Sequence, residues 1–167
     1  MELNIVLHEP EIPQNTGNIA RTCAAVGANL HLIEPLGFKI DDKHVRRAGL
    51  DYWDKLNVKT YKNLDDFFKN NPDGQYVFGT TKAPKNHTEI VYEKKCYIFF
   101  GKESKGLPEE LLIKHPEGCV RIPMRGELRS LNLSNCAAIM AYEALRQNNF
   151  ESLNSKGELH NLSWESS

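Results

Sequence analysis

The chain has 167 residues, of which 40% are hydrophobic and 26% are charged, and its net charge is −1 at pH 7. This length and composition are those of one globular domain that can bury a core. Because no stretch approaches the roughly 20 apolar residues of a membrane span and none has the form of a secretory leader, we expect a cytoplasmic protein with no membrane partner.

Short apolar runs rich in β-branched and aromatic residues alternate with helical patterns along the chain. This alternation predicts an α/β fold in which helices cover a parallel sheet. Asn63 is a candidate N-cap, and Pro108 suits a first helical turn. Residues 1–150 would form the domain, and the polar residues 151–167 a loosely held tail. Strands are expected at 3–7, 30–33, 58–61, 76–80, 96–101 and 119–124, and helices at 15–26, 64–69, 108–114 and 133–147.

Four cysteines, Cys23, Cys96, Cys119 and Cys136, stand far apart, without a Cys-x-x-Cys pair or a histidine at ligand spacing. This pattern is more typical of reduced cysteines in the core of a cytoplasmic protein than of a metal centre. We therefore expect no metal site.

Basic residues gather in three places, although the overall charge is close to neutral. Affinity for a nucleic-acid backbone depends on such clusters more than on the net charge. Each cluster taken alone is nevertheless more typical of a solvated surface. The clusters are Lys39, Lys43, His44, Arg46 and Arg47, then Lys82, Lys85 and His87, then Arg121, Arg125 and Arg129.

Three of the expected strands end in segments rich in glycine or short polar side chains, at 79–81, 101–106 and 122–130. Ligands of open α/β sheets bind beyond the carboxyl ends of the strands, where glycine lets a ligand approach the backbone. One such loop is equally well explained as an ordinary turn. Three of them in one chain favour a binding site.

Phosphate-binding fingerprints are missing from these loops. No strand is followed by G-x-G-x-x-G, and the glycines of 101–106 have P-loop spacing but are followed by Leu107 and Pro108, where Lys and Ser or Thr are required. A nucleoside triphosphate or a dinucleotide is therefore not expected. An adenosine ligand without phosphate stays open, since residues 122–124 and 131–133 offer an apolar slot.

The segment 129–135, with the sequence RSLNLSN, carries four short polar residues where a helix start needs one capping residue. The helix that follows has small and apolar residues on more than one face. This distribution fits either a subunit interface or the core of a monomer.

Three motifs, taken in order, resemble the SPOUT superfamily of knotted RNA methyltransferases, and within it the tRNA 2′-O-ribose methyltransferases that act on the wobble nucleotide. The segments 36–38 and 46–52 further resemble the compact wobble-methylating branch. The resemblance covers nearly the whole chain before the tail. The motifs are NTGNIAR at 15–21, preceded by EPEIP at 9–13, then FGKESKGL at 100–107, then IPM at 122–124 followed by 129–135.

The resemblance implies a Rossmann-like parallel sheet whose C-terminal segment is threaded through a loop to form a deep trefoil knot. It also implies a homodimer that uses S-adenosylmethionine to methylate a ribose 2′-hydroxyl in the anticodon stem-loop of tRNA. The expected nucleotide is position 34, a cytidine or a modified uridine, and the expected substrates are tRNA-Leu isoacceptors. Two copies of the basic clusters would flank one site, which answers the objection from net charge.

Carried over residue by residue, the resemblance assigns the cofactor contacts to the knot loops. Arg21 would act at the ribose, while Asn18 and Glu103 would orient Arg21 and the loop 101–106. The cofactor contacts would be Gly79, Gly101, Ile122 and Ser130, with Thr80, Met124, Leu131 and Asn132 as second candidates.

Two roles for Arg21 are open. The resemblance suggests a base that takes the hydroxyl proton, but a guanidinium loses its own proton reluctantly, because its pKa lies far above neutral pH. We favour a role in which Arg21 binds the adjacent phosphate and stabilises the negative charge that develops on the oxygen.

Two rival functions remain. One is an RNA-binding module that kept the knot without the chemistry, and the other is a methyltransferase that acts on a base. The intact motifs speak against the first rival, and the Asn-x-Gly-Asn-x-x-Arg signature at 15–21 favours the ribose over the base.

Overall fold

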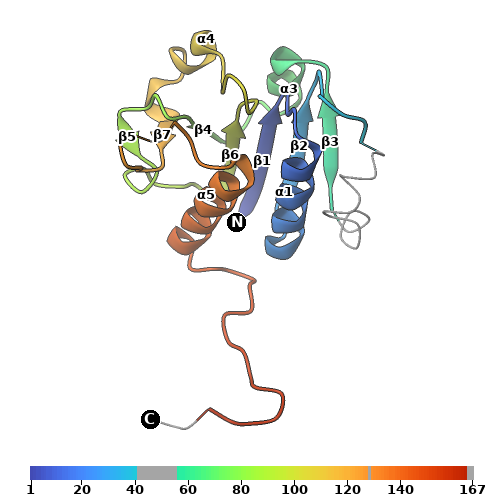
Figure 1. The fold of residues 1–167 in the computed structure, drawn as a ribbon, viewed down its shortest axis with the longest axis vertical. Coiled ribbons are helices and arrows are strands. Elements are labelled where there is room, and N and C mark those ends of the chain that lie inside the picture. Colours follow the sequence, from blue (N-terminus) through green and yellow to red (C-terminus); the bar gives the residue numbers. More distant parts are fainter. Residues whose placement is uncertain (41–55, 128, 165–167) are drawn as a thin grey trace.

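The computed structural model describes residues 1–40, 56–127 and 129–164. Within these residues one sheet has the strand order β3-β2-β1-β6-β4-β7-β5, and its neighbouring strands all run parallel (Figure 1). The α/β fold with a parallel sheet is therefore confirmed. The strands are β1 (Glu2–His8), β2 (Asn29–Ile33), β3 (Val58–Tyr61), β4 (Gln75–Gly79), β5 (Lys85–Asn86), β6 (Lys95–Phe100) and β7 (Cys119–Arg121).

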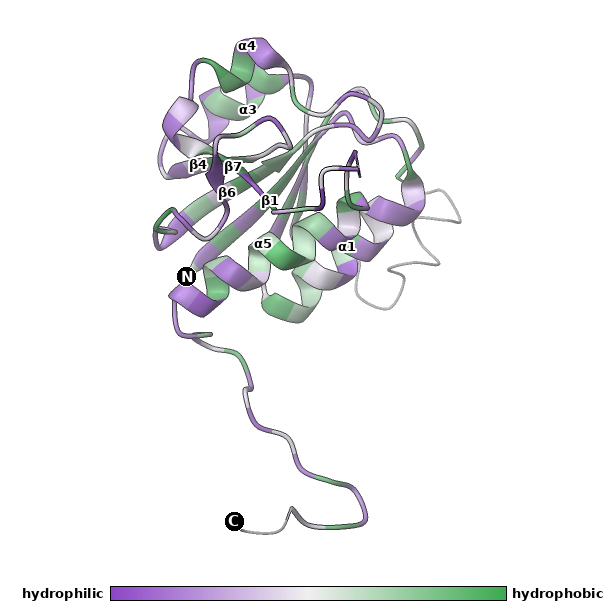
Figure 2. Ribbon diagram, turned by 60° about the vertical axis from the view of Figure 1, so that its left-hand side comes forward, coloured by the Kyte–Doolittle hydropathy of each residue, from purple (hydrophilic) through white to green (hydrophobic). Residues whose placement is uncertain are grey.

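Helices cover both faces of this sheet. α1 (Pro13–Val26) and α5 (Leu133–Gln147) lie side by side on one face (Figures 1 and 2). α3 (Leu64–Asn70) and α4 (Glu109–Leu112) contribute to the core of the other face, and the short 3-10 helix η2 (Pro116–Gly118) precedes β7. No helix within the described ranges is long and apolar enough to cross a membrane.

The two faces have different cores, which the strands feed alternately. Ile5 of β1 packs with Ile19 and Ala141 under α1 and α5. Its neighbour Val6 packs on the opposite side with Phe67, under α3. The alternation follows from the two-residue period of a strand, which sends successive side chains to opposite faces.

Most of the expected elements are confirmed to within one or two residues. Asn63 is the N-cap of α3, because its side-chain oxygen accepts a hydrogen bond from the backbone nitrogen of Asp66 at 2.8 Å. α1 begins two residues early, at Pro13, where a proline is tolerated because the first turn has no hydrogen-bond partner for an N–H.

Two expectations about the second half of the chain were wrong, and one strand was missed. β7 ends at Arg121 and not at residue 124, since Pro123 has no N–H to donate to a neighbouring strand. α4 covers only Glu109–Leu112, and Pro108 is its extended N-cap with ψ of 136°. The short β5 was not expected, because two residues carry no periodicity.

The polar segment after α5 stays attached to the domain over its first residues. Phe150 and Leu153 pack against the core under α1 and α5. The Glu151 carboxylate accepts hydrogen bonds from the amino group of Met1 at 3.4 Å and from Lys94 Nζ at 2.9 Å. Residues 154–164 then run away from the body of the protein (Figure 1).

Candidate functional site

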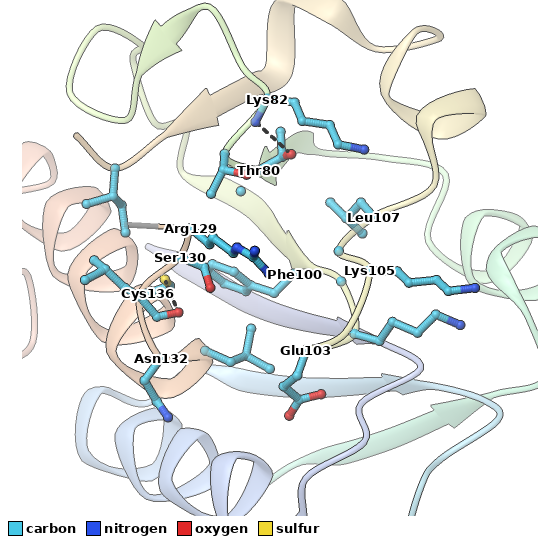
Figure 3. A pocket seen from close by; sticks show the side chains of 18 of the residues that line it. Thr80, Lys82, Phe100, Glu103, Lys105, Leu107, Arg129, Ser130, Asn132 and Cys136 are labelled. Carbon is cyan, nitrogen blue, oxygen red and sulfur yellow. Dashed lines mark hydrogen bonds between the residues drawn. The ribbon is translucent and has the colours of Figure 1, made fainter. Parts of the chain in front are cut away.

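A cavity of about 620 Å³ opens at the carboxyl end of the sheet, among the loops that follow β4, β6 and β7 and the start of α5 (Figure 3). After β1 the chain continues to β2, towards one edge of the sheet. After the neighbouring β6 it continues to β7, towards the other edge. Loops that diverge in this way open a crevice, which is the usual ligand site of doubly wound sheets.

Every residue expected to contact the cofactor lines this cavity. The residues come from four separate segments, so the fold brings together positions that are up to 53 residues apart. Two lie at the end of β4, one follows β6, two follow β7 and three precede α5. They are Gly79 and Thr80, then Gly101, then Ile122 and Met124, then Ser130, Leu131 and Asn132.

The loop 101–106 is a tight turn that forms one wall of the cavity. Lys102 and Gly106 form a β-bridge, and Gly106 has a φ of +73°, which glycine adopts without strain. A Cβ on Gly101 would lie 2.0 Å from the carbonyl carbon of Gly106. No side chain fits at Gly101, so this loop can close only with glycine there.

A chain of hydrogen bonds joins the three motifs around the cavity. The Asn132 side-chain nitrogen donates to Asn15 Oδ1 at 3.0 Å, and Asn15 Nδ2 donates to Glu103 Oε1 at 3.0 Å. Glu103 also accepts from the backbone nitrogens of Glu11 at 2.8 Å and Ile12 at 3.2 Å. Glu103 therefore binds the turn before α1 to the loop 101–106.

Asn132 has a second task at the start of α5. Its side-chain oxygen accepts from the backbone nitrogen of Ser134 at 2.9 Å and from the Ser134 hydroxyl at 2.6 Å, so Asn132 is the N-cap of the helix. Three of the four short polar residues of the segment 129–135 therefore have distinct places. Ser130 and Asn132 line the cavity, and Ser134 belongs to the first turn of α5.

Arg21 and Asn18 lie elsewhere. Both are exposed residues on α1, three positions apart and therefore on one side of that helix, and neither lines the cavity. On the neighbouring α5, Ile139 and Tyr142 are also exposed, at 38% and 48%. The outer surface of the α1 and α5 layer thus combines polar and apolar groups.

The expected cluster of Lys82, Lys85 and His87 is less basic than its sequence suggests. Lys82 forms an ion pair with Glu109 at 2.5 Å, and Lys85 forms one with Glu117 at 2.6 Å. Each lysine lowers the pKa of its partner carboxylate. Lys43, His44, Arg46 and Arg47 lie outside the described residues.

Sequence reasoning did not single out some residues that line the cavity, including Asn15, Met140 and Cys136. Asn15 is the first residue of the motif at 15–21, so the motif could have indicated it as a site residue. Met140 and Cys136 belong to an apolar stretch of α5 that reads as ordinary core. Burial raises the pKa of the Cys136 thiol, which favours its neutral form.

The parallel sheet and its loop-lined cavity define an α/β protein of the Rossmann-like class. The family model described as the SpoU rRNA Methylase family matches residues 2–142. The chain belongs to this family.

Individual relatives agree with the family. A tRNA (cytidine(34)-2′-O)-methyltransferase of Saccharophagus degradans is 51% identical over 148 residues, which are 88% of this chain and 96% of the relative. A solved structure described under "Structural insights into the 2-OH methylation of C/U34 on tRNA" has a TM-score of 0.84 and 44% identity, covering 89% of this chain and 97% of its own. The AdoMet-bound rRNA methyltransferase of Sinorhizobium meliloti has a TM-score of 0.79 and 28% identity, covering 87% of this chain and 56% of its own.

Proposed function

We propose that this chain uses S-adenosylmethionine to methylate the ribose 2′-hydroxyl of the wobble nucleotide of tRNA, in the cytoplasm. The nucleotide is position 34, a cytidine or a modified uridine, and tRNA-Leu isoacceptors are the expected substrates. The observation that carries the proposal is the convergence of three separate sequence motifs on one cavity. The names of the relatives support the choice of reaction and nucleotide.

The chemistry of the cavity lining suits S-adenosylmethionine. The cofactor has no phosphate, and adenine needs an apolar slot, which Ile122, Leu131 and Leu133 can form. Gly79 lets the end of β4 pack closely against Phe100 in the cavity wall, because a Cβ there would lie 2.9 Å from the Phe100 ring. When bound, the cofactor supplies an electrophilic methyl group. We include the deep trefoil knot in the proposal, since the loops that meet at the cavity are those that the family threads.

Methyl transfer requires the protein to orient the ribose hydroxyl and to stabilise the charge that develops on its oxygen. We assign this role to Arg21, whose guanidinium would bind the phosphate next to the reacting ribose. Asn18 lies on the same side of α1 and orients the guanidinium. Glu103 acts at a distance, by holding the loop 101–106 against α1.

The proposal includes a homodimer. The reason is that Arg21 is exposed on α1 and does not line the cavity of its own protomer. Pairing of two α1 and α5 surfaces would cover Ile139 and Tyr142 and build each tRNA site from both subunits. A sedimentation experiment on the pure protein tests this point, and a monomer at micromolar concentration would reject it.

The decisive experiment incubates the pure protein with total tRNA and S-adenosylmethionine that carries a labelled methyl group. We expect label at the 2′-oxygen of nucleotide 34, located by nuclease digestion and mass spectrometry. tRNA from a strain that lacks the gene serves as substrate, because its site is unmethylated. Label on a base, or label confined to ribosomal RNA added in parallel, would reject the proposal.

The silent RNA-binding module is tested in the same experiment. Such a module would bind tRNA without transferring any label. Calorimetry with S-adenosylmethionine then separates a protein that cannot bind the cofactor from one that binds it but lacks the correct RNA.

A further inference from the structure

Two carboxylates form hydrogen bonds in opposite directions between the turn before α1 and the loop 101–106. Glu11, from the turn, accepts hydrogen bonds from the backbone nitrogen and the hydroxyl of Ser104, both at 2.8 Å. Glu103, from the loop, accepts hydrogen bonds from the backbone nitrogens of Glu11 and Ile12. Each segment therefore supplies both an acceptor side chain and donor groups to the other.

We propose that Glu11 is a positioning residue for the cofactor, which it serves by holding Ser104 and with it the loop wall of the cavity. This inference rests on the proposed use of S-adenosylmethionine. Ser104 lines the cavity, whereas Glu11 does not, so Glu11 acts on a bound molecule only through the loop. The resemblance of the motifs assigns no role to Glu11.

The loop 101–106 is a tightly closed turn, which makes its outer anchors important. Gly101 and Gly106 are in contact and the bridge between Lys102 and Gly106 closes the turn, so the loop has little internal freedom. Its distance from α1 then depends on the bonds that cross the gap. Besides the two carboxylates, Lys102 binds Glu9 at 2.5 Å.

Glu11 is itself held firmly from the other side. The backbone nitrogen of Gly37 donates to the Pro10 carbonyl at 2.9 Å. A Cβ on Gly37 would lie 2.7 Å from the Glu11 carbonyl oxygen, so the two backbones are in direct contact. The segment 34–40 thus supports the turn from behind, and Glu11 transmits that support to the loop.

The charge of Glu11 strengthens the contact. The bonds from the Ser104 backbone nitrogen and then from its hydroxyl lower the pKa of the Glu11 carboxyl, and Lys102 and Lys105 act in the same direction. An ionised acceptor forms shorter and stronger hydrogen bonds than a neutral one. The carboxylate is therefore ionised at neutral pH and suits two donors at once.

The experiment measures cofactor affinity and catalysis separately in the full-length protein. For Glu11→Ala we expect the Kd of S-adenosylmethionine, measured by calorimetry, to rise about tenfold, which corresponds to about 1.4 kcal/mol. The KM of the cofactor should rise in parallel, and kcat at saturating cofactor should stay within about twofold of wild type. Glu2→Ala, at the far end of β1, removes the same charge and should leave all three constants unchanged.

Two further variants test the route through Ser104. Glu11→Gln keeps an acceptor of the same length, so it should restore most of the affinity. Ser104→Ala should weaken binding less than Glu11→Ala does, since the backbone nitrogen still donates. In the double variant of Glu11→Ala and Ser104→Ala, the loss should equal that of Glu11→Ala alone and not the sum of the two.

The outcomes separate this inference from the proposed function. A wild-type protein that binds no S-adenosylmethionine rejects the proposed function. Wild-type binding together with unchanged Kd and KM in Glu11→Ala rejects the positioning role alone. A purely structural role would lower the fraction of active enzyme, and so kcat, at unchanged KM, which also rejects it. If Glu11→Ala does not fold, Glu11→Gln and Ser104→Ala are compared instead: a smaller rise of Kd and KM at unchanged kcat in Ser104→Ala supports the positioning role, and unchanged Kd and KM in Ser104→Ala reject it.

Discussion

The two faces of the sheet differ in what their side chains do. Under α1 and α5 the core is built from small and aliphatic residues such as Ala137, Ala141 and Ile19, and this side carries the motifs and the exposed Arg21. Under α3 the core is largely aromatic, and Phe67 and Phe99 lie at its centre. Small residues let α5 approach the sheet closely, whereas aromatic rings bury the most area. One face carries the motifs, and the other has the more aromatic core.

The aromatic face also holds a buried polar network around His31. Asn4 Oδ1 lies 3.1 Å from His31 Nε2, and the Tyr61 hydroxyl lies 2.9 Å from Nδ1. Because an amide oxygen only accepts, Nε2 must carry the proton and Nδ1 must accept from Tyr61. The Tyr61 oxygen in turn accepts from Asn71 Nδ2 at 3.2 Å. The network is satisfied only while His31 is neutral.

The largest effect on stability is expected when a ring is removed from the aromatic core under α3. Phe67 is fully buried, and its ring centroid lies 5.0 Å from that of Tyr61 and 5.1 Å from that of Phe99. We expect Phe67→Ala to lower the free energy of unfolding by about 3–5 kcal/mol, measured in urea. The folded fraction should keep its cofactor affinity. Ile113→Ala, at a side chain that is 75% exposed, is the control and should change stability little.

The opposite change removes a functional group from the α1 and α5 face. Arg21→Ala should reduce kcat for tRNA methylation by about 10²- to 10³-fold, since it removes stabilisation of the charge that develops on the oxygen. Cofactor affinity and the free energy of unfolding should stay near wild type. Lys69→Ala, an exposed cation on α3, controls for the loss of one positive charge. Wild-type turnover in Arg21→Ala would contradict the assignment.

The sequence predicted the fold well where apolar or helical patterns were long, and its glycine-rich motifs indicated which loops line the cavity. β1 is a run of mostly apolar residues and α5 has a helical period, whereas β5 has only two residues and is defined by the pairing of Lys85 with Val120. Gly101 is required because a Cβ there would meet the backbone of Gly106, and the motif at 100–107 includes this glycine.

Other features depend on contacts between distant residues, which a single sequence does not display. The ion pair of Lys82 with Glu109 joins positions 27 residues apart, and the bonds from Ser104 to Glu11 join positions 93 apart. No local pattern distinguishes these charges from solvated ones. For the same reason Met140 reads as core, although it lines the cavity.

Acid should weaken the aromatic face of the sheet. Burial, with a smaller effect of Lys59, lowers the pKa of His31 to about 4 from an ordinary value of 6.5. The unfolded chain therefore binds a proton that the folded chain refuses between these two values. The free energy of unfolding should fall as pH drops from about 6.5 to about 4, by about 3 kcal/mol in total.

Urea titrations at pH 7 and pH 5 measure this slope. His8 contributes in the same direction, because burial lowers its pKa as well. His31→Gln disturbs the hydrogen bonds to Tyr61 and Asn4, so the variant should be less stable at pH 7. Because glutamine does not titrate, the variant should also lose most of the pH dependence that His31 provides. An unchanged slope in His31→Gln would show that the aromatic face is not the acid-sensitive part.

The smallest effect is expected from the segment that belongs to neither face. Removal of residues 155–167 deletes the exposed Leu159, Leu162 and Trp164 but keeps Phe150, Leu153 and the ion pairs of Glu151. The free energy of unfolding should change by less than about 0.5 kcal/mol, as for surface changes in general, and methylation should be unaffected. Truncation after residue 147 is the matched comparison and should destabilise the protein measurably, since it removes Phe150 and Leu153 from the core under α1 and α5. Equal stability of the two truncated proteins would mean that the domain ends at α5 and that the contacts of residues 150–153 contribute nothing.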